Sequence, residues 1–212
     1  MSAMAAYESV LRSGSEFWVR VPDGRLLALP VQRWLDDATP CDGTMLDLCV
    51  GPTLDIGCGP GRLTRALTDR GIEALGIDLS AEAVRLAVSR GVPALQADVF
   101  AELPREGTWA SILLADGNIG IGGDPVPLLR RCTELLTAHG SVIVEVDPPG
   151  SGITRGRVHV TADGLQGWMP WATVAAEALP AVAADAGMVV RTSTVTPSGR
   201  HMAQLVRGRP TA

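Results

Sequence analysis

The chain has 212 residues, 46% hydrophobic and 19% charged, which predicts one globular domain with a full hydrophobic core. All eighteen basic residues are arginine, which excludes a lysine Schiff base and a phosphate-binding loop of the G-x-x-x-x-G-K type. A formal net charge of −5 argues against broad nucleic-acid binding. The four cysteines lack CxxC spacing and the three histidines are scattered, so we expect no metal site. Without a secretory signal or a membrane segment in the sequence, we expect a cytoplasmic protein.

The first 51 residues are expected to form a cap over a sheet. Helical runs surround a predicted hairpin with strands at Phe17–Val21 and Arg25–Leu29 and a turn at Pro22-Asp23-Gly24.

From residue 52 to residue 147, short β-type runs alternate with helical runs. Strands are expected at Pro52–Ile56, Glu73–Asp78, Pro93–Ala97, Trp109–Ala115 and Ser141–Val146. Helices are expected over Arg62–Arg70, after an N-cap at Ser80, and from an N-cap at Asp124 to an end at Gly140. Repeated βα units predict an α/β fold, a doubly wound and mostly parallel sheet with helices on both faces.

The remaining residues depart from this alternation. Residues 148–172 begin with a run rich in proline and glycine, which predicts an insertion; Asp147-Pro148-Pro149-Gly150 is interpreted as an element that turns the chain. Over residues 173–212 we expect a closing helix within Ala175–Ala186, kinked at or starting near Pro180, and an antiparallel hairpin of Val189–Val195 and His201–Arg207. The whole chain is thus predicted to be one domain with a seven-stranded sheet.

The segment Leu54-Asp55-Ile56-Gly57-Cys58-Gly59-Pro60-Gly61-Arg62 joins a predicted strand to a predicted helix. Glycines there allow a tight turn and close approach of a ligand to helix N–H groups. The spacing D-x-G-x-G-x-G resembles motif I of the class I, Rossmann-like S-adenosylmethionine-dependent methyltransferases. A dinucleotide site usually has G-x-G-x-x-G instead.

The resemblance covers most of residues 52–147 and implies a cofactor, S-adenosyl-L-methionine, that leaves as S-adenosyl-L-homocysteine. It implies that Asp78 binds the ribose hydroxyls, that Asp98 meets the adenine amino group, and that Asp55 helps to hold the methionine amino group. Asp116 then faces the methionine part of the cofactor. The full implied cofactor set is Asp55, Gly57, Cys58, Gly59, Gly61, Asp78, Leu79, Asp98, Val99, Asp116 and Gly117.

A physical argument points the same way. Four carboxylates at the carboxyl ends of successive strands would repel the phosphates of a dinucleotide, whereas S-adenosylmethionine has a sulfonium, an ammonium and no phosphate. Two alternatives stay open: a protein that binds this cofactor without transferring methyl, as a regulator or a repurposed cyclase-type enzyme, and an NAD(P)-dependent oxidoreductase.

The methyl acceptor is expected to be a small molecule that is methylated on O, N or C. The segment Asp116-Gly117-Asn118-Ile119 lacks the N/D-P-P-Y/F of many nucleic-acid and amino-group methyltransferases, and the composition disfavours nucleic acid. The resemblance places acceptor recognition in N-terminal elements and in the insertion, which would cover the acceptor pocket. The candidate residues are Trp18, Trp34, Asn118, Arg155, Arg157, Trp168 and Trp171. Core packing for the tryptophans and a solvated loop for the arginines are the competing interpretations.

Two residues are candidates for catalysis, if the acceptor must lose a proton. His159 has a suitable ordinary pKa and is assigned as the base, and Asp116 as a positioning residue. Catalysis by proximity alone, without a base, is the alternative. The sequence does not indicate the oligomeric state.

Overall fold

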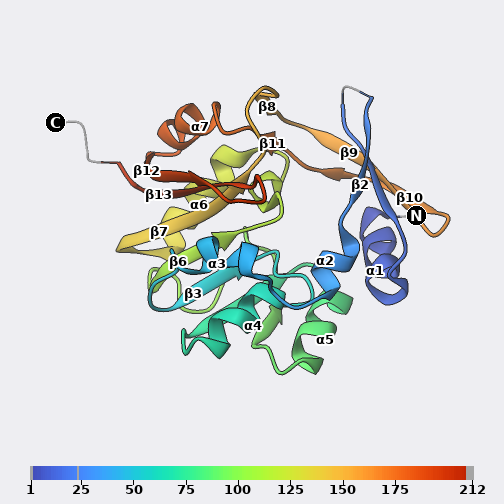
Figure 1. Cartoon of the computed structure of the whole chain (residues 1–212), viewed down its shortest axis with the longest axis horizontal. Coiled ribbons are helices and arrows are strands. Elements are labelled where there is room, and N and C mark those ends of the chain that lie inside the picture. Colours follow the sequence, from blue (N-terminus) through green and yellow to red (C-terminus); the bar gives the residue numbers. More distant parts are fainter. Residues whose placement is uncertain (1, 23, 209–212) are drawn as a thin grey trace.

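The computed structural model describes residues 2–22 and 24–208, and its main element is a seven-stranded sheet (Figure 1). The strand order is β12-β13-β7-β6-β3-β4-β5, with β13 antiparallel to both neighbours and the other pairings parallel. The strands are β3 (Thr53–Ile56), β4 (Ala74–Asp78), β5 (Ala94–Gln96), β6 (Trp109–Leu114), β7 (Leu136–Val146), β12 (Met188–Val195) and β13 (His201–Arg207). The predicted fold class is confirmed.

The strand order reverses at β3. The chain runs outward from β3 through β4 to β5 and then returns to β6 on the other side of β3. Open α/β sheets bind ligands outside the carboxyl ends of the strands at such a reversal. The loops that follow β3 and β6 therefore border the expected crevice.

Helices cover both faces of this sheet. Ile143 packs with α3 and α4, whereas its neighbour Val144 packs with α6 and α7, because successive side chains on a strand point to opposite faces. The helices of the described ranges are α1 (Ala3–Ser13), α2 (Val31–Leu35), α3 (Pro40–Leu46), α4 (Arg62–Asp69), α5 (Ala81–Ser89), α6 (Pro125–Leu135) and α7 (Leu179–Asp185), with a 3₁₀ turn, η1, at Asn118–Gly120. None of them is long and apolar enough to cross a membrane.

A second, antiparallel sheet stands beside the first, in the order β10-β9-β1-β2 (Figure 1). It combines the N-terminal hairpin with most of the predicted insertion. Its strands are β1 (Phe17–Arg20), β2 (Leu26–Leu29), β9 (Arg157–Ala162) and β10 (Leu165–Pro170), and a short pair, β8 (Ile153–Thr154) and β11 (Thr173–Val174), joins it to the main sheet. Asp23, in the predicted hairpin turn, lies outside the described residues.

Helix α1 covers one face of the second sheet. Its Ala6 and Val10 pack with Phe17, Val19 and Val160, all of them buried. Hydrogen bonds to a single carboxylate also join α1 and the segment after it to the β9–β10 turn. Asp163 in that turn accepts hydrogen bonds from the hydroxyls of Ser9 (2.6 Å), Ser13 (3.0 Å) and Ser15 (2.6 Å).

The helix expected to end at Gly140 is shorter than predicted. α6 ends at Leu135 and β7 begins at Leu136, whose backbone is already extended. Gly140 is not a helix end: a Cβ there would lie 3.0 Å from the backbone oxygen of Trp109, so this glycine allows β7 to approach β6 closely. α7 begins at Leu179 with Pro180 in its first turn, one of the two arrangements expected there.

Candidate active site

The loop after β3 has the strained geometry that its glycines predict. Gly57, Gly59 and Gly61 all have positive φ, and a Cβ on Gly57 would lie 2.6 Å from the Asn118 side-chain nitrogen. That nitrogen donates hydrogen bonds to the backbone oxygens of Ile56 (2.8 Å) and Gly57 (2.9 Å). Asn118, predicted to bind the acceptor, thus fixes the loop after β6 to the loop after β3.

Asp78 lies at the end of β4, against the glycine loop. Its two carboxylate oxygens accept hydrogen bonds from the backbone N–H groups of Gly59 (3.0 Å) and Ser80 (2.8 Å). Burial raises the pKa of Asp78, and these two N–H groups oppose that rise. The contacts fix the orientation of the carboxylate while each oxygen keeps a lone pair for a ligand.

Two of the predicted cofactor residues lie beneath the loop. Asp55 is buried and accepts a hydrogen bond from the Thr64 hydroxyl (2.6 Å); burial raises its pKa to about 6. Cys58 is also buried, and its sulfur fills the space where a Cβ on Gly76 would lie. Both side chains are placed to stabilise the loop from below.

The remaining cofactor candidates follow β4 and β5. Leu79 is about half exposed, at 51%. Asp98 accepts a hydrogen bond from the Phe100 N–H (3.0 Å), and Val99 is buried in the main core. They lie after two neighbouring parallel strands, at the same edge of the sheet as Asp78.

The loop after β6 is strained at Asp116. This residue has φ of 53°, a left-handed conformation that is uncommon for a residue with a side chain, and Gly117 follows with φ of 84°. The Asp116 N–H donates to the Glu145 carboxylate (2.9 Å). The Trp171 ring lies 4.0 Å from the Cβ position of Gly117, so one predicted acceptor residue does reach this loop.

Asp116 belongs to a network of three arginines and three acids, which we call the charge cluster. Arg62 contacts Asp116 (2.7 Å) and Asp42 (2.8 Å), and Arg33 contacts Asp116 (2.9 Å). Arg200, in the β12–β13 turn, contacts Glu145 (2.6 Å) and Asp42 (2.6 Å). The members are Arg33, Asp42, Arg62, Asp116, Glu145 and Arg200.

Two acids of the charge cluster, Asp42 and Glu145, are held in their ionised form. Burial alone would raise the pKa of Asp42, but the Thr39 N–H and the guanidinium groups of Arg62 and Arg200 hold it well below its usual range. Arg200 likewise outweighs burial and lowers the pKa of Glu145. The three positive and three negative formal charges balance, so the cluster joins segments distant in the sequence without net formal charge, with Asp42 and Arg62 buried at its centre and the other members partly exposed.

The structure also brings Tyr7, on α1, to this site, which nothing in the sequence predicted. Its hydroxyl lies 3.4 Å from the position that a Cβ on Gly59 would take. Its ring packs at 6.1 Å from Phe17 and 6.0 Å from Trp34, which places Trp34, a predicted acceptor residue, behind Tyr7. Burial and then the Asp78 carboxylate raise the pKa of Tyr7 well above its usual value, so the hydroxyl stays protonated. It makes no hydrogen bond within the described residues.

Four candidates on the second sheet share its outward face. Val158 and Val160 of β9 are buried on the α1 side, so His159 between them points away from α1. The His159 ring packs on Trp168 at 5.1 Å, and Trp168 is 58% exposed. The structure does not bring these residues to Asp116. The four are Trp18, Arg157, His159 and Trp168. Arg155 instead pairs with Asp124, the N-cap of α6 (3.0 Å).

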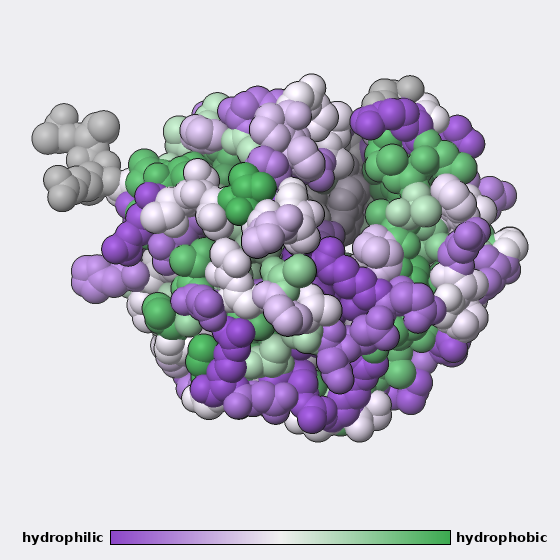
Figure 2. Space-filling view, in the orientation of Figure 1, coloured by the Kyte–Doolittle hydropathy of each residue, from purple (hydrophilic) through white to green (hydrophobic). Residues whose placement is uncertain are grey.

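A groove of 530 Å³ separates the β1–β2 hairpin from the segment that follows β7. Figure 2 shows this hollow between the apolar surface of the hairpin and the body of the molecule. One wall is Val21, Pro22, Arg25 and Leu27; the other is Asp147, Pro148, Gly150, Ser151, Thr154 and Thr173.

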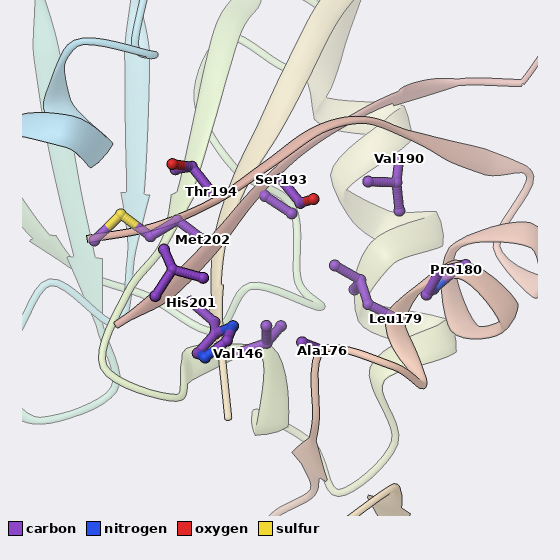
Figure 3. A pocket seen from close by; sticks show the side chains of 11 residues that line it. Val146, Ala176, Leu179, Pro180, Val190, Ser193, Thr194, His201 and Met202 are labelled. Atoms are coloured by element: carbon purple, nitrogen blue, oxygen red, sulfur yellow. The ribbon is translucent and has the colours of Figure 1, made fainter. Parts of the chain in front are cut away.

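A smaller cavity of 270 Å³ lies between α7 and the β12–β13 hairpin (Figure 3). Its walls are mostly apolar, with Leu179 from α7 and Val190 from β12, and His201 is the ionisable side chain in its lining. β13, β7 and β6 separate β12 from β3 in the sheet, so this cavity is remote from the glycine loop.

A family model described as "Methyltransferase domain" matches residues 53–140, which hold the glycine loop, Asp78 and Asp116. Over residues 53–140 the chain is therefore similar to methyltransferase domains. The matched range contains the D-x-G-x-G-x-G segment and the acids after the strands, on which the resemblance seen in the sequence rests. No curated protein matches the chain.

Solved methyltransferases have the same fold. An S-adenosylmethionine-dependent methyltransferase from Bacteroides fragilis, solved with S-adenosyl-L-homocysteine, is 23% identical, with a TM-score of 0.81 over 97% of this chain and 94% of that one. The 1,6-didemethyltoxoflavin-N1-methyltransferase of Burkholderia thailandensis is 18% identical, with a TM-score of 0.63 over 99% and 92%. A sugar N-methyltransferase from Streptoalloteichus is 17% identical, with a TM-score of 0.59 over 82% and 89%.

Proposed function

We propose that this chain binds S-adenosylmethionine in the crevice of its methyltransferase domain and transfers the methyl group to a small-molecule acceptor. The observation that carries the proposal is the arrangement around the glycine loop. Asp78, the Asn118 amide and the Tyr7 hydroxyl border it from three different elements. The toxoflavin and sugar enzymes named above act on small molecules, which supports the same class of acceptor here.

The residues present fit the cofactor. Asp78 has lone pairs for two ribose hydroxyls, and its carboxylate is already oriented by two N–H groups. The Tyr7 hydroxyl is a protonated donor without a partner in the described residues, aimed at the loop where the methionine part would lie. Asp78 and Asp98, which form no ion pair within the described residues, suit a ligand with a sulfonium and an ammonium better than the phosphates of a dinucleotide.

S-adenosylmethionine, when bound, supplies a methyl group on a sulfonium, which is a good leaving group. The chain's contribution is then to hold both partners in line and to exclude water. The left-handed backbone at Asp116 and Gly117 fixes the loop beside the acceptor position, and two arginines occupy the Asp116 carboxylate. We therefore keep Asp116 as a positioning residue. The sequence favoured His159 as a general base; because its ring lies on the outward face beside Trp168, we propose catalysis by proximity alone.

The test is calorimetric titration with S-adenosylmethionine and, separately, with NADH. Asp78→Ala removes two charge-assisted hydrogen bonds of roughly 1.5–3 kcal/mol each, so the cofactor affinity should fall at least about tenfold. Asp69→Ala, on the exposed end of α4, is the matched control and should bind normally. Unchanged affinity in Asp78→Ala, or tight NADH binding by the native protein, would refute the assignment. Cofactor binding without S-adenosylhomocysteine from any small-molecule pool would favour a binding protein without transferase activity.

A further inference from the structure

The groove between the β1–β2 hairpin and the segment after β7 has two chemically different walls. The hairpin wall presents Val21 and Leu27, and Leu27 is 39% exposed although it is a large apolar side chain. The opposite wall presents the Asp147 carboxylate and the Thr154 and Thr173 hydroxyls, which lie 2.7 Å from each other. The volume of the groove, 530 Å³, is within the range of roughly 300–1,000 Å³ that is typical of small-molecule sites.

The Asp147 carboxylate is available to a ligand. Its backbone is fixed, because its N–H donates to Val174 (2.9 Å) and its carbonyl oxygen accepts from Ala176 (2.9 Å). Its side chain, in contrast, has no hydrogen bond or ion pair to any residue in the described ranges. Glu145, two residues before it at the end of β7, and Asp116, next to Glu145, are both paired with arginines. The backbone of Asp147 is therefore held in place, while its carboxylate has no fixed partner within the described residues.

The surroundings of Asp147 favour a positively charged partner. Burial and the Glu145 carboxylate raise its pKa, and Arg25 on the facing wall opposes that rise. A cation placed against Asp147 would relieve its repulsion with Glu145. The hydroxyls of the same wall supply further hydrogen bonds, and the apolar hairpin wall suits a hydrocarbon part.

The groove also adjoins the site of transfer. β6 and β7 are parallel neighbours, and the Asp116 N–H is 2.9 Å from the Glu145 carboxylate. Asp147 follows Glu145 by two residues in extended chain, a step of about 7 Å. A molecule of ordinary size seated on Asp147 therefore reaches the Asp116 loop.

We infer that this groove is the acceptor site and that Asp147 recognises an amino group on the acceptor, whose apolar part packs against Val21 and Leu27. This inference rests on the proposed function, which it narrows to amine-bearing acceptors. Asp147 is then a specificity-determining residue, separate from the residues that bind the cofactor.

The experiment compares two probes of nearly the same shape, benzylamine and benzyl alcohol, by saturation-transfer NMR titration at pH 7. The native protein should bind the amine at least about tenfold more tightly than the alcohol, as a charge-assisted contact implies. Asp147→Asn keeps the shape and removes the charge, so the preference should fall to about one. Asp69→Asn makes the same change in net charge on the surface of α4 and should keep the preference.

Equal or undetectable binding of both probes to the native protein would overturn the inference, as would an unchanged preference in Asp147→Asn. Thermal unfolding of each variant checks that the fold is intact. Titration of the same samples with S-adenosylmethionine separates the two proposals. Cofactor binding without amine preference refutes the acceptor site alone, whereas amine preference without cofactor binding refutes the proposed function alone.

Discussion

Replacing Arg62 with methionine should destabilise the fold by about 3 kcal/mol at pH 7. The Arg62 side chain is 3% exposed and contacts Asp42 at 2.8 Å and Asp116 at 2.7 Å. Removing one partner of a buried ion pair costs about 3–5 kcal/mol, because the remaining charge is left buried. Arg33 and Arg200 still face the two acids in the variant, so the lower end applies. For a chain of this length the loss corresponds to about 6–12 °C in Tm.

The loss should depend on pH with a definite sign. The pKa of Asp42 is lowered in the folded protein, so its ionised form contributes stability above its unfolded pKa, about 3.9, and that contribution is lost as the pH falls. Without Arg62 the pKa of Asp42 moves back up. The difference in the free energy of unfolding between native and Arg62→Met protein should therefore be smaller at pH 3.5 than at pH 7.

Urea unfolding followed by circular dichroism at the two pH values measures both effects. Arg65→Met is the matched control, three residues along the same helix, where Arg65 pairs with Asp69 at 3.2 Å on the surface. Its loss should stay below about 1 kcal/mol, as for exposed ion pairs. Equal losses for the two variants at pH 7, or a loss for Arg62→Met that does not change with pH, would show that the charge cluster is not a buried, coupled unit.

Two further substitutions test the crevice. Tyr7→Phe should weaken S-adenosylmethionine binding by roughly two- to tenfold in calorimetry without lowering Tm, because the hydroxyl has no hydrogen bond to the described residues; unchanged affinity would remove Tyr7 from the site. His159→Ala should change kcat by less than about threefold and leave cofactor affinity intact, because the ring packs on Trp168 on the outward face. A fall in kcat of about 10²–10⁴-fold would instead establish His159 as the base.

The sequence predicted the main sheet because its signals are local. A run such as Ala74–Asp78 is buried on both faces, and each strand is bounded by a glycine turn or by an N-cap such as Ser80. The predicted end of α6 was wrong because Gly140 allows β7 to pack closely on β6. In the sequence, a glycine required for close packing cannot be distinguished from a glycine that ends a helix.

The candidate site was harder to predict because its composition depends on which face of a strand each side chain occupies and on contacts between residues distant in the sequence. Trp18 and His159 are chemically suitable, yet a shift of one residue along a strand reverses the face, and Val19 and Val160 are the ones that turn inward. Asp147 stood in a segment that looked like a simple chain turn. The charge cluster draws its members from six separate segments, so no window of sequence contains it.

The attachment of α1 to the β9–β10 turn bears on how ligands enter and leave. The Tyr7 hydroxyl lies beside Gly59, so a ligand bound along the glycine loop would contact α1. Asp163 ties α1 and the chain just after it to the second sheet through three serine hydroxyls. The helix therefore cannot lift alone: it either breaks these bonds or carries the sheet with it, and the wall that holds Val21 and Leu27 travels along. The cofactor crevice and the acceptor groove therefore share one mechanical support.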